Sequence, residues 1–382
     1  MSAAIDDLGG IGVFVKPGEK VLLKANLLME KRPEEATLTH PSVLKAITQI
    51  LIENDNAVII GDSPGGPFTA GMLAKIYRTG RYSELAEQTG ATLNSNFKSC
   101  SRENPRGLLL KKITLTDMLN DVDKVINVSK LKTHGMMTFT GAVKNMFGTV
   151  PGIMKAEYHM NMPEYDDFAN ALIDICLAAD PVLSLMDGVV CMEGHGPSAG
   201  EPRKLGLVLA SASPFALDRA ACEIISLEPE SVPTLRAAAA RGLCPSDMSD
   251  IECVGDCIDG FRVTDFVIPK PGRINPSQSL PPFVQKLMSR ALQPRPVFLP
   301  NKCTNCGVCA ANCPVKVISF TAHEHKPHVK LDGCIRCYCC QELCPAKAIE
   351  IKRPFLMRIF VENSLSNLSS SIIRKIQFRK RS

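Results

Sequence analysis

Two cysteine runs in the last quarter of the chain constrain its fold more than any other feature. Both follow the spacing C-x2-C-x2-C-x3-C and end directly in proline. The first run consists of Cys303, Cys306, Cys309 and Cys313, and the second of Cys334, Cys337, Cys340 and Cys344. A doubled run of this kind is the bacterial pattern for two cubane iron–sulfur clusters, in which the fourth cysteine of each run binds the other cluster.

We therefore predict two 4Fe-4S clusters with crossed ligand sets. The first cluster is assigned to Cys303, Cys306, Cys309 and Cys344. The second is assigned to Cys334, Cys337, Cys340 and Cys313. Cys339 lies between two ligands of the second run and is left over. Zinc is the alternative, because tetrahedral zinc sites also use C-x2-C pairs, but two complete runs that each end in Cys-Pro favour clusters.

The cysteine content also bears on the compartment. The 382-residue chain contains sixteen cysteines, and its N-terminal sequence MSAAIDDLGGIGVF has neither the basic stretch nor the apolar core of a signal peptide. Cysteines of an intracellular chain serve metals or catalysis more often than disulfides. We expect a cytoplasmic protein.

Alternating strand and helix patterns in residues 1–267 predict an α/β domain with a largely parallel or mixed sheet. KVLLKANLL reads as a strand, HPSVLKAITQILIEND as a helix and AVIIGD as the next strand, and the cycle repeats as far as PFALDRAACEII. Residues 268–300 contain eight prolines and are predicted to be an extended linker. Residues 301–352 predict a small α+β ferredoxin-like domain with both clusters, and residues 353–382 a basic amphipathic tail.

Four segments follow predicted strands, and ligands of open α/β sheets bind at the carboxyl ends of strands. They are LLKANLL (22–28), GDSPGGP (61–67), SKLKTHGMMTFTGAVKNMFG (129–148) and MDGVVCMEGHGPSAGEP (186–202). The predicted strand KVINVSKL runs into the third segment as far as Leu131, the rest of that segment is expected to be a loop, and its lysines and histidine suit a carboxylate or phosphate ligand. A plain solvated basic loop is the alternative. No P-loop, dinucleotide fingerprint or nucleophile elbow is present.

Particular side chains in these segments are candidates for chemistry. Asp62 opens a Gly/Pro loop, where a helix cap or turn residue is the alternative reading. The candidate catalytic residues are Lys130, Lys132, His134, Asp62 and Glu193. The candidate substrate-binding residues are Lys144, Asn145, Asp187 and Gly196. Together they predict a pocket for an anionic small molecule.

The motifs GDSPGG, KLKTH, GAVKNMFG, MDG and EGHGPSAGEP, in this order before a two-cluster run, resemble the iron–sulfur proteins of the "domain of unknown function 362" family. The resemblance covers about residues 15 to 352. It implies iron–sulfur binding in a bacterial or archaeal protein, often of anaerobes. The motif positions that carry over are the nine candidates named above. The chain departs from the family in having no proline after the lysine of LLKANLL, and it begins late, so we expect an N-terminal strand to be missing.

Charge is concentrated in the tail. Residues 353–382 contain seven Arg or Lys and one Glu, a net +6, whereas the whole chain carries +5. A basic amphipathic helix here would lie on an anionic membrane surface or dock on protein, so a peripheral membrane location stays open. The absence of tryptophan and of an aromatic platform argues against nucleic acid as a partner.

Three classes of function fit these patterns. The leading one is a redox enzyme that passes electrons between the clusters and the anionic small molecule, with a redox partner protein or small electron donor. The second is a non-catalytic electron carrier whose α/β domain only docks a partner. The third is a non-redox enzyme whose clusters are structural or sense oxygen.

Overall fold

The computed structural model describes residues 1–162, 164–245, 247–269, 294–320 and 327–352. The predicted tail and most of the predicted linker lie outside these residues. The first part contains a seven-stranded sheet of order β3-β2-β1-β6-β8-β9, with β7 paired to β6. Its strands are β1 (Lys20–Lys24), β2 (Ala57–Gly61), β3 (Thr92–Leu93), β6 (Lys124–His134), β7 (Thr138–Thr140), β8 (Leu183–Glu193) and β9 (Glu201–Ser211). A separate hairpin consists of β4 (Ser99–Glu103) and β5 (Lys112–Thr116).

The predicted fold class is confirmed. Strands β3, β2, β1, β6 and β8 pair in parallel, and β7 and β9 are antiparallel to their neighbours. The chain runs from β1 outward to β2 and β3, then returns to place β6 on the other side of β1. The strand order therefore reverses between β1 and β6, and such a reversal opens a crevice at the carboxyl ends of the two strands.

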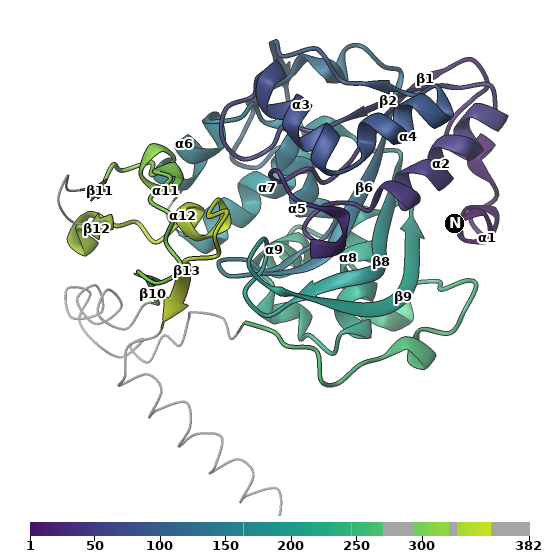
Figure 1. Ribbon diagram of the computed structural model, residues 1–382. Coiled ribbons are helices and arrows are strands. Elements are labelled where there is room, and N and C mark those ends of the chain that lie inside the picture. The colour runs from purple at the N-terminus through teal and green to yellow at the C-terminus, as the bar shows by residue number, and fades with distance from the viewer. Residues whose placement is uncertain (163, 246, 270–293, 321–326, 353–382) are drawn as a thin grey trace, which may run out of the picture.

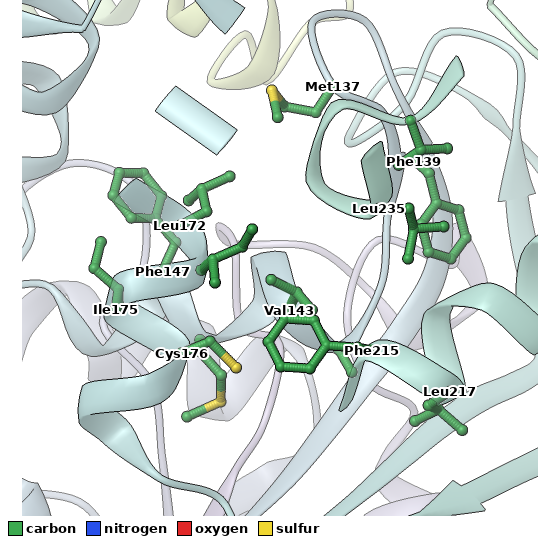
Figure 2. Packing of buried hydrophobic residues seen from close by; sticks show 14 of the residues in the cluster. Met137, Phe139, Val143, Phe147, Leu172, Ile175, Cys176, Phe215, Leu217 and Leu235 are labelled. Atoms are coloured by element: carbon green, nitrogen blue, oxygen red, sulfur yellow. The ribbon is translucent and has the colours of Figure 1, made fainter. Parts of the chain in front are cut away.

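Helices cover both faces of the sheet (Figure 1). One apolar cluster joins alternate strand residues such as Val21 and Leu23 to the first four helices, and the other joins Leu22 and Val125 to the later ones. The first set is α1 (Ser2–Asp6), α2 (Pro41–Glu53), α3 (Ala70–Thr79) and α4 (Tyr82–Thr89). The second set is α5 (Ala142–Asn145), α7 (Tyr165–Ala179), α8 (Pro214–Ile224) and α9 (Pro233–Ala240). Figure 2 shows the second cluster, where Phe147, Leu172 and Cys176 pack near Val143 and Phe215.

Local sequence explains why α2 forms where it does. His40 caps the helix, its Nδ1 accepting from the Ser42 amide at 3.2 Å, and Pro41 occupies the first helical position. Val43, Leu44, Ile47 and Leu51 then recur at helical spacing and are buried against the sheet.

The basic segment 129–148 was expected to be a loop beyond the predicted strand KVINVSKL, and that expectation is wrong. Strand β6 continues through Lys130 and Lys132 to His134, because β7 returns along its end and β8 pairs with it as far as Met192. The backbone of this segment is thus hydrogen-bonded to the neighbouring strands β7 and β8. Buried lysines at alternate positions replace the apolar residues by which a strand is usually identified.

The cysteine-rich part is small and lies on the side of the α/β part away from the N-terminus (Figure 1). Its elements are β10 (Arg295–Phe298), α11 (Val308–Ala311), β11 (Ile318–Phe320), β12 (Pro327–Val329), α12 (Cys339–Glu342) and β13 (Ile349–Lys352). The end of the predicted linker needs correction, because β10 pairs antiparallel with β13 and puts Pro296 opposite Ile351. Proline is tolerated on an edge strand. The other boundaries stay predictions.

Asp218 on α8 ties that helix to the short helix α5. Its carboxylate accepts from the amides of Ala142 at 2.5 Å and Val143 at 3.0 Å, which are helical donors without intrahelical partners. Burial raises the pKa of Asp218 to about 7, while the two amides favour its charged form. Gly141 leaves room for the carboxylate, since a Cβ there would lie 2.0 Å from Oδ1.

Replacing Asp218 tests this cap. Asp218→Ala leaves two buried amides without acceptors, and we expect a loss of about 3 kcal/mol in the free energy of unfolding, at about 1–3 kcal/mol for each group. Asp218→Asn keeps one acceptor oxygen and should lose less. Thermal unfolding followed by circular dichroism measures both. Equal midpoints for Asp218→Ala and the wild type would show that the cap contributes nothing.

Candidate functional site

The two cysteine runs adopt the same backbone. The second residue after the first cysteine of each run has a left-handed φ, 56° at Asn305 and 58° at Arg336. Two residues further on, φ is 73° at Gly307 and 60° at Tyr338, and these two residues are the N-caps of α11 and α12. This internal repeat is the arrangement that a doubled cluster-binding sequence predicts.

The first predicted ligand set lines one small cavity. Cys303, Cys306, Cys309 and Cys344 all face it, together with apolar and small residues such as Phe298 and Ala348. Burial raises the pKa of the Cys309 thiol to about 11, with smaller contributions from the thiols of the other three. Four sulfur donors around an apolar cavity are the donor set that a cubane cluster requires, and its binding would displace the thiol protons. The residues present therefore fit the group.

The second predicted set also comes together. Burial raises the pKa of Cys340 well above its ordinary value, and the neighbouring thiols of Cys337, Cys334, Cys309 and Cys313 add to that rise. The Cys313 thiol also raises the pKa of Cys334, so Cys313 of the first run lies near cysteines of the second. The assignment of individual ligands stays a prediction, which iron analysis of variants tests.

A larger cavity of about 300 Å³ lies where the α/β part meets the cysteine-rich part. From the α/β part it is lined by the carboxyl ends of β1 and β2 and by α6 (Met154–Asn161). From the cysteine-rich part it is lined by Cys313, Cys339 and Glu342, among others. The cavity thus occupies the crevice at the β1/β6 reversal and has a predicted cluster ligand in its wall.

Lys24 and Asp62 form the polar floor of this cavity. The Lys24 ammonium group is fully buried, lies 2.9 Å from Asp62 Oδ1 and donates to the Asn145 carbonyl at 2.5 Å and the Asn145 Oδ1 at 3.1 Å. The other Asp62 oxygen accepts from the Leu27 amide at 2.7 Å. Asp62 and Asn145, both predicted from sequence, therefore line the cavity and hold Lys24, which the prediction did not name.

Three further lysines of the α/β part line the cavity without a carboxylate partner. Lys132 donates to Asn26 Oδ1 and to the Thr37 carbonyl, each at 2.8 Å. Lys155 donates to the carbonyls of Val150 at 2.6 Å and Ser63 at 2.9 Å. Burial holds the pKa of Lys132 well below its ordinary value and lowers that of Lys155 to about 7.

Lys144 differs from these because its ammonium group has no hydrogen bond or ion pair with any described residue. Its Nζ lies 5.9 Å from the centre of the Phe147 ring, a cation–π contact. Burial lowers its pKa as well, while the charge of Glu342 acts in the opposite direction. Lys144 was predicted to bind substrate, and the structure places it in the cavity.

Other predicted site residues lie outside the cavity. Lys130 and Asp187 form a buried ion pair at 2.7 Å, and Asp187 also accepts from the His40 amide at 2.9 Å. Glu193 accepts from the Val267 amide at 3.0 Å. Gly196 packs on β6, where a Cβ would lie 2.1 Å from the Thr133 carbonyl oxygen. These residues support the wall of the site and do not face a ligand there.

His134 joins the two parts of the molecule. Its Nδ1 accepts from the amides of Met136 at 3.0 Å and Met137 at 3.1 Å, so the neutral ring carries its proton on Nε2. Nε2 lies 2.8 Å from Glu342 Oε1 on α12. Burial lowers the pKa of His134 to about 4, so at neutral pH an uncharged imidazole donates to a carboxylate. Ser198 Oγ adds a bond to the Glu342 carbonyl at 2.5 Å.

Several site residues carried no recognisable signal in the sequence. Glu342 lies within the second cysteine run, and Lys155 and His159 lie on a helix outside the four chosen segments. Lys24 lies inside LLKANLL, one of the four chosen segments. Its position at the end of a predicted strand was the signal that could have identified it as a site residue.

Comparison with known proteins places this architecture among iron–sulfur proteins with a 4Fe-4S dicluster domain, which matches residues 295–345. Residues 21–223 match the family described as "Domain of unknown function (DUF362)", and the chain belongs to this family. The thylakoid-associated protein sll1697 of Synechocystis is 37% identical over 258 residues, which are 63% of this chain and 74% of that protein.

Among solved structures, the lactate racemase apoprotein from Thermoanaerobacterium thermosaccharolyticum is similar at 14% identity with a TM-score of 0.37. The match covers 56% of this chain and 50% of that one.

Gly148 offers a test of the cavity floor. A Cβ there would lie 2.0 Å from Asp62 Oδ1 and 2.5 Å from Lys24 Nζ, so Gly148→Ala must displace the buried pair. We expect a loss of about 3 kcal/mol in the free energy of unfolding, the lower end for a broken buried ion pair.

Gly71→Ala is the matched control, because nothing lies within 4 Å of a Cβ at that position in α3. It should be neutral or slightly stabilising. Thermal unfolding of both variants is the measurement. A Gly148→Ala protein as stable as Gly71→Ala would mean that the pair tolerates displacement.

Proposed function

We propose that this protein is an iron–sulfur redox protein that transfers electrons between its clusters and an anionic small molecule bound in the 300 Å³ cavity. One observation carries the proposal. Cys313, a predicted ligand of the second cluster, lines the same cavity as Lys132, Lys144 and Lys155. A ligand held by these lysines would lie beside the cluster environment, as electron transfer requires.

The chain's own groups have distinct tasks in this proposal. The clusters, when bound, supply one-electron transfer. Lys144 attracts and orients the anion, since its ammonium group is unpaired among the described residues. Lys155 Nζ is suited to exchange a proton with the ligand, because its pKa of about 7 leaves both forms populated at neutral pH. The predicted proton carriers His134 and Glu193 are engaged elsewhere.

Iron analysis tests the cluster part of the proposal. Anaerobically purified protein should contain about eight irons and eight sulfides per chain, as two cubanes require, and its reduced form should give the broadened EPR signal of two interacting clusters. Cys313→Ser should lose about half the iron, since it removes one ligand of one cluster. Cys339→Ser, its matched control, should keep all of it. Zinc in place of iron, or equal iron in the two variants, would contradict the ligand assignment.

Reoxidation kinetics test the electron-transfer part. Protein reduced with dithionite and freed of excess reductant should be reoxidised by some member of a panel of small carboxylates and phosphate esters that carry a carbonyl group or a carbon–carbon double bond, which can take up two electrons and two protons, as followed by cluster absorbance. Lys144→Met should slow that reaction at least tenfold. A panel that leaves the clusters reduced would favour the electron carrier or the non-redox enzyme.

We also propose peripheral attachment to an anionic membrane surface through residues 353–382. The similar Synechocystis protein is named as thylakoid-associated. None of the helices in the described residues has the length and apolarity of a membrane span. The tail has seven basic residues against one acid, and each basic residue near an anionic surface contributes about 1 kcal/mol.

Vesicle sedimentation tests the attachment. The full chain should sediment with phosphatidylglycerol vesicles and less with phosphatidylcholine vesicles. Changing Arg379, Lys380 and Arg381 to serine should weaken binding to the anionic vesicles at least tenfold, whereas the same number of lysine-to-serine changes at Lys45, Lys75 and Lys112 should not. Equal sedimentation of both variants would assign the tail to another partner.

A further inference from the structure

The charges that line the cavity are out of balance. Five lysines face it, of which Lys316 is exposed to solvent. The other four, Lys24, Lys132, Lys144 and Lys155, are buried or half-buried, against the two carboxylates of Asp62 and Glu342. Asp62 is already paired with Lys24, and Glu342 accepts from the uncharged ring of His134. An enclosed cluster of like charges is costly unless an opposite charge joins it. With these four lysines protonated, the enclosed lining has a formal excess of two positive charges.

Two uncharged polar groups in the same lining also lack partners. Thr140 Oγ1 and His159 Nδ1 are buried, and neither has a hydrogen-bond partner in the described part of the chain. The exposed fractions of these side chains are 4% and 5%. The His159 ring is fixed by stacking on Phe168 with 4.4 Å between ring centres. Buried polar groups usually have a partner, so two orphans beside an unpaired ammonium group point to a ligand with several acceptor atoms.

The size of the cavity restricts that ligand. A volume of about 300 Å³ is at the lower end for ligand sites. Lysine ammonium groups act as point charges and suit both phosphate and carboxylate oxygens.

We propose that the cavity binds a compact dianion, a small phosphate ester or a dicarboxylate, through Lys132, Lys144 and Lys155, with Thr140 and His159 as further partners. The inference rests on the proposed function for the location of the site and adds the charge and chemical class of the ligand. A monoanion would leave one of the two excess charges unmatched. Burial is the main cause of the lowered pKa values of the three lysines, and a bound anion would act in the opposite direction.

Calorimetric titration of the oxidised, cluster-loaded full chain at pH 7 tests the inference. Succinate, glycerol 3-phosphate and butyrate are the probes, because butyrate has the carbon chain of succinate with one charge fewer. At least one of the two dianions should bind ten or more times tighter than butyrate. Which of them binds decides between a dicarboxylate and a phosphate ester. Failure of both dianions to bind, or equal binding of butyrate, would overturn the inference.

Variants connect the binding to this cavity. Lys144→Met should weaken dianion binding at least tenfold and remove most of the preference over butyrate, and Thr140→Val should weaken it less. Lys112→Met removes the same charge from an exposed surface pair and should change nothing. Unchanged affinity in Lys144→Met, with intact cluster absorbance, would place the binding elsewhere. Should Lys144→Met fail to fold, Thr140→Val alone decides, and an unchanged affinity in that variant would equally overturn the inference.

The titration needs no electron transfer, so its outcome is separate from that of the reoxidation test. Dianion binding, together with a reducible panel that leaves the clusters reduced, would leave the inference standing and contradict the redox proposal. Reoxidation of the clusters by a monoanion, together with binding that does not favour dianions over butyrate, would support the redox proposal and overturn the inference.

Discussion

The buried ammonium group of Lys24 is the interaction on which the site depends. It is the last residue of β1, and it reaches Asp62 after β2 and Asn145 at the end of α5. Three segments far apart in sequence are therefore held at one point by one side chain. A lysine without these acceptors could not be buried at that depth, because desolvation of its charge would cost several kcal/mol.

The lysines around the cavity floor can be compared by the partners that compensate for their burial. Lys130 is buried against Asp187 with its charge matched, and it belongs to the supporting wall. Lys132, on the same face of β6, has only uncharged acceptors. Two lysines at alternate positions of one strand thus differ in their partners. Lys130 has a counter-charge, whereas Lys132 forms no ion pair with any described residue.

The sequence predicted the fold class and the cysteine-rich part well because these rest on local patterns. Cysteine spacing fixes a loop geometry, and alternation of strands and helices fixes an α/β class. It predicted the site less completely. The strand over KVINVSKL was predicted, but its continuation past Leu131 through Lys132 to His134 was not, since these buried positions carry polar side chains. The partnership of His134 with Glu342 depends on how two separately folded segments meet, and no spacing within either one encodes it. Glu193 and Gly196 resembled ligand residues because loops that pack closely on their own chain use the same residue types.

The cavity has walls from both parts of the molecule, and this affects how the protein would respond to oxygen. In the proposed function, clusters would organise the loops that carry Cys313 and Cys339, while Glu342 is also held by His134 and Ser198. Loss of the clusters would therefore loosen one wall of the cavity together with the redox centre. An anion bound there would be held less tightly, so oxidative damage would weaken ligand binding and electron transfer together.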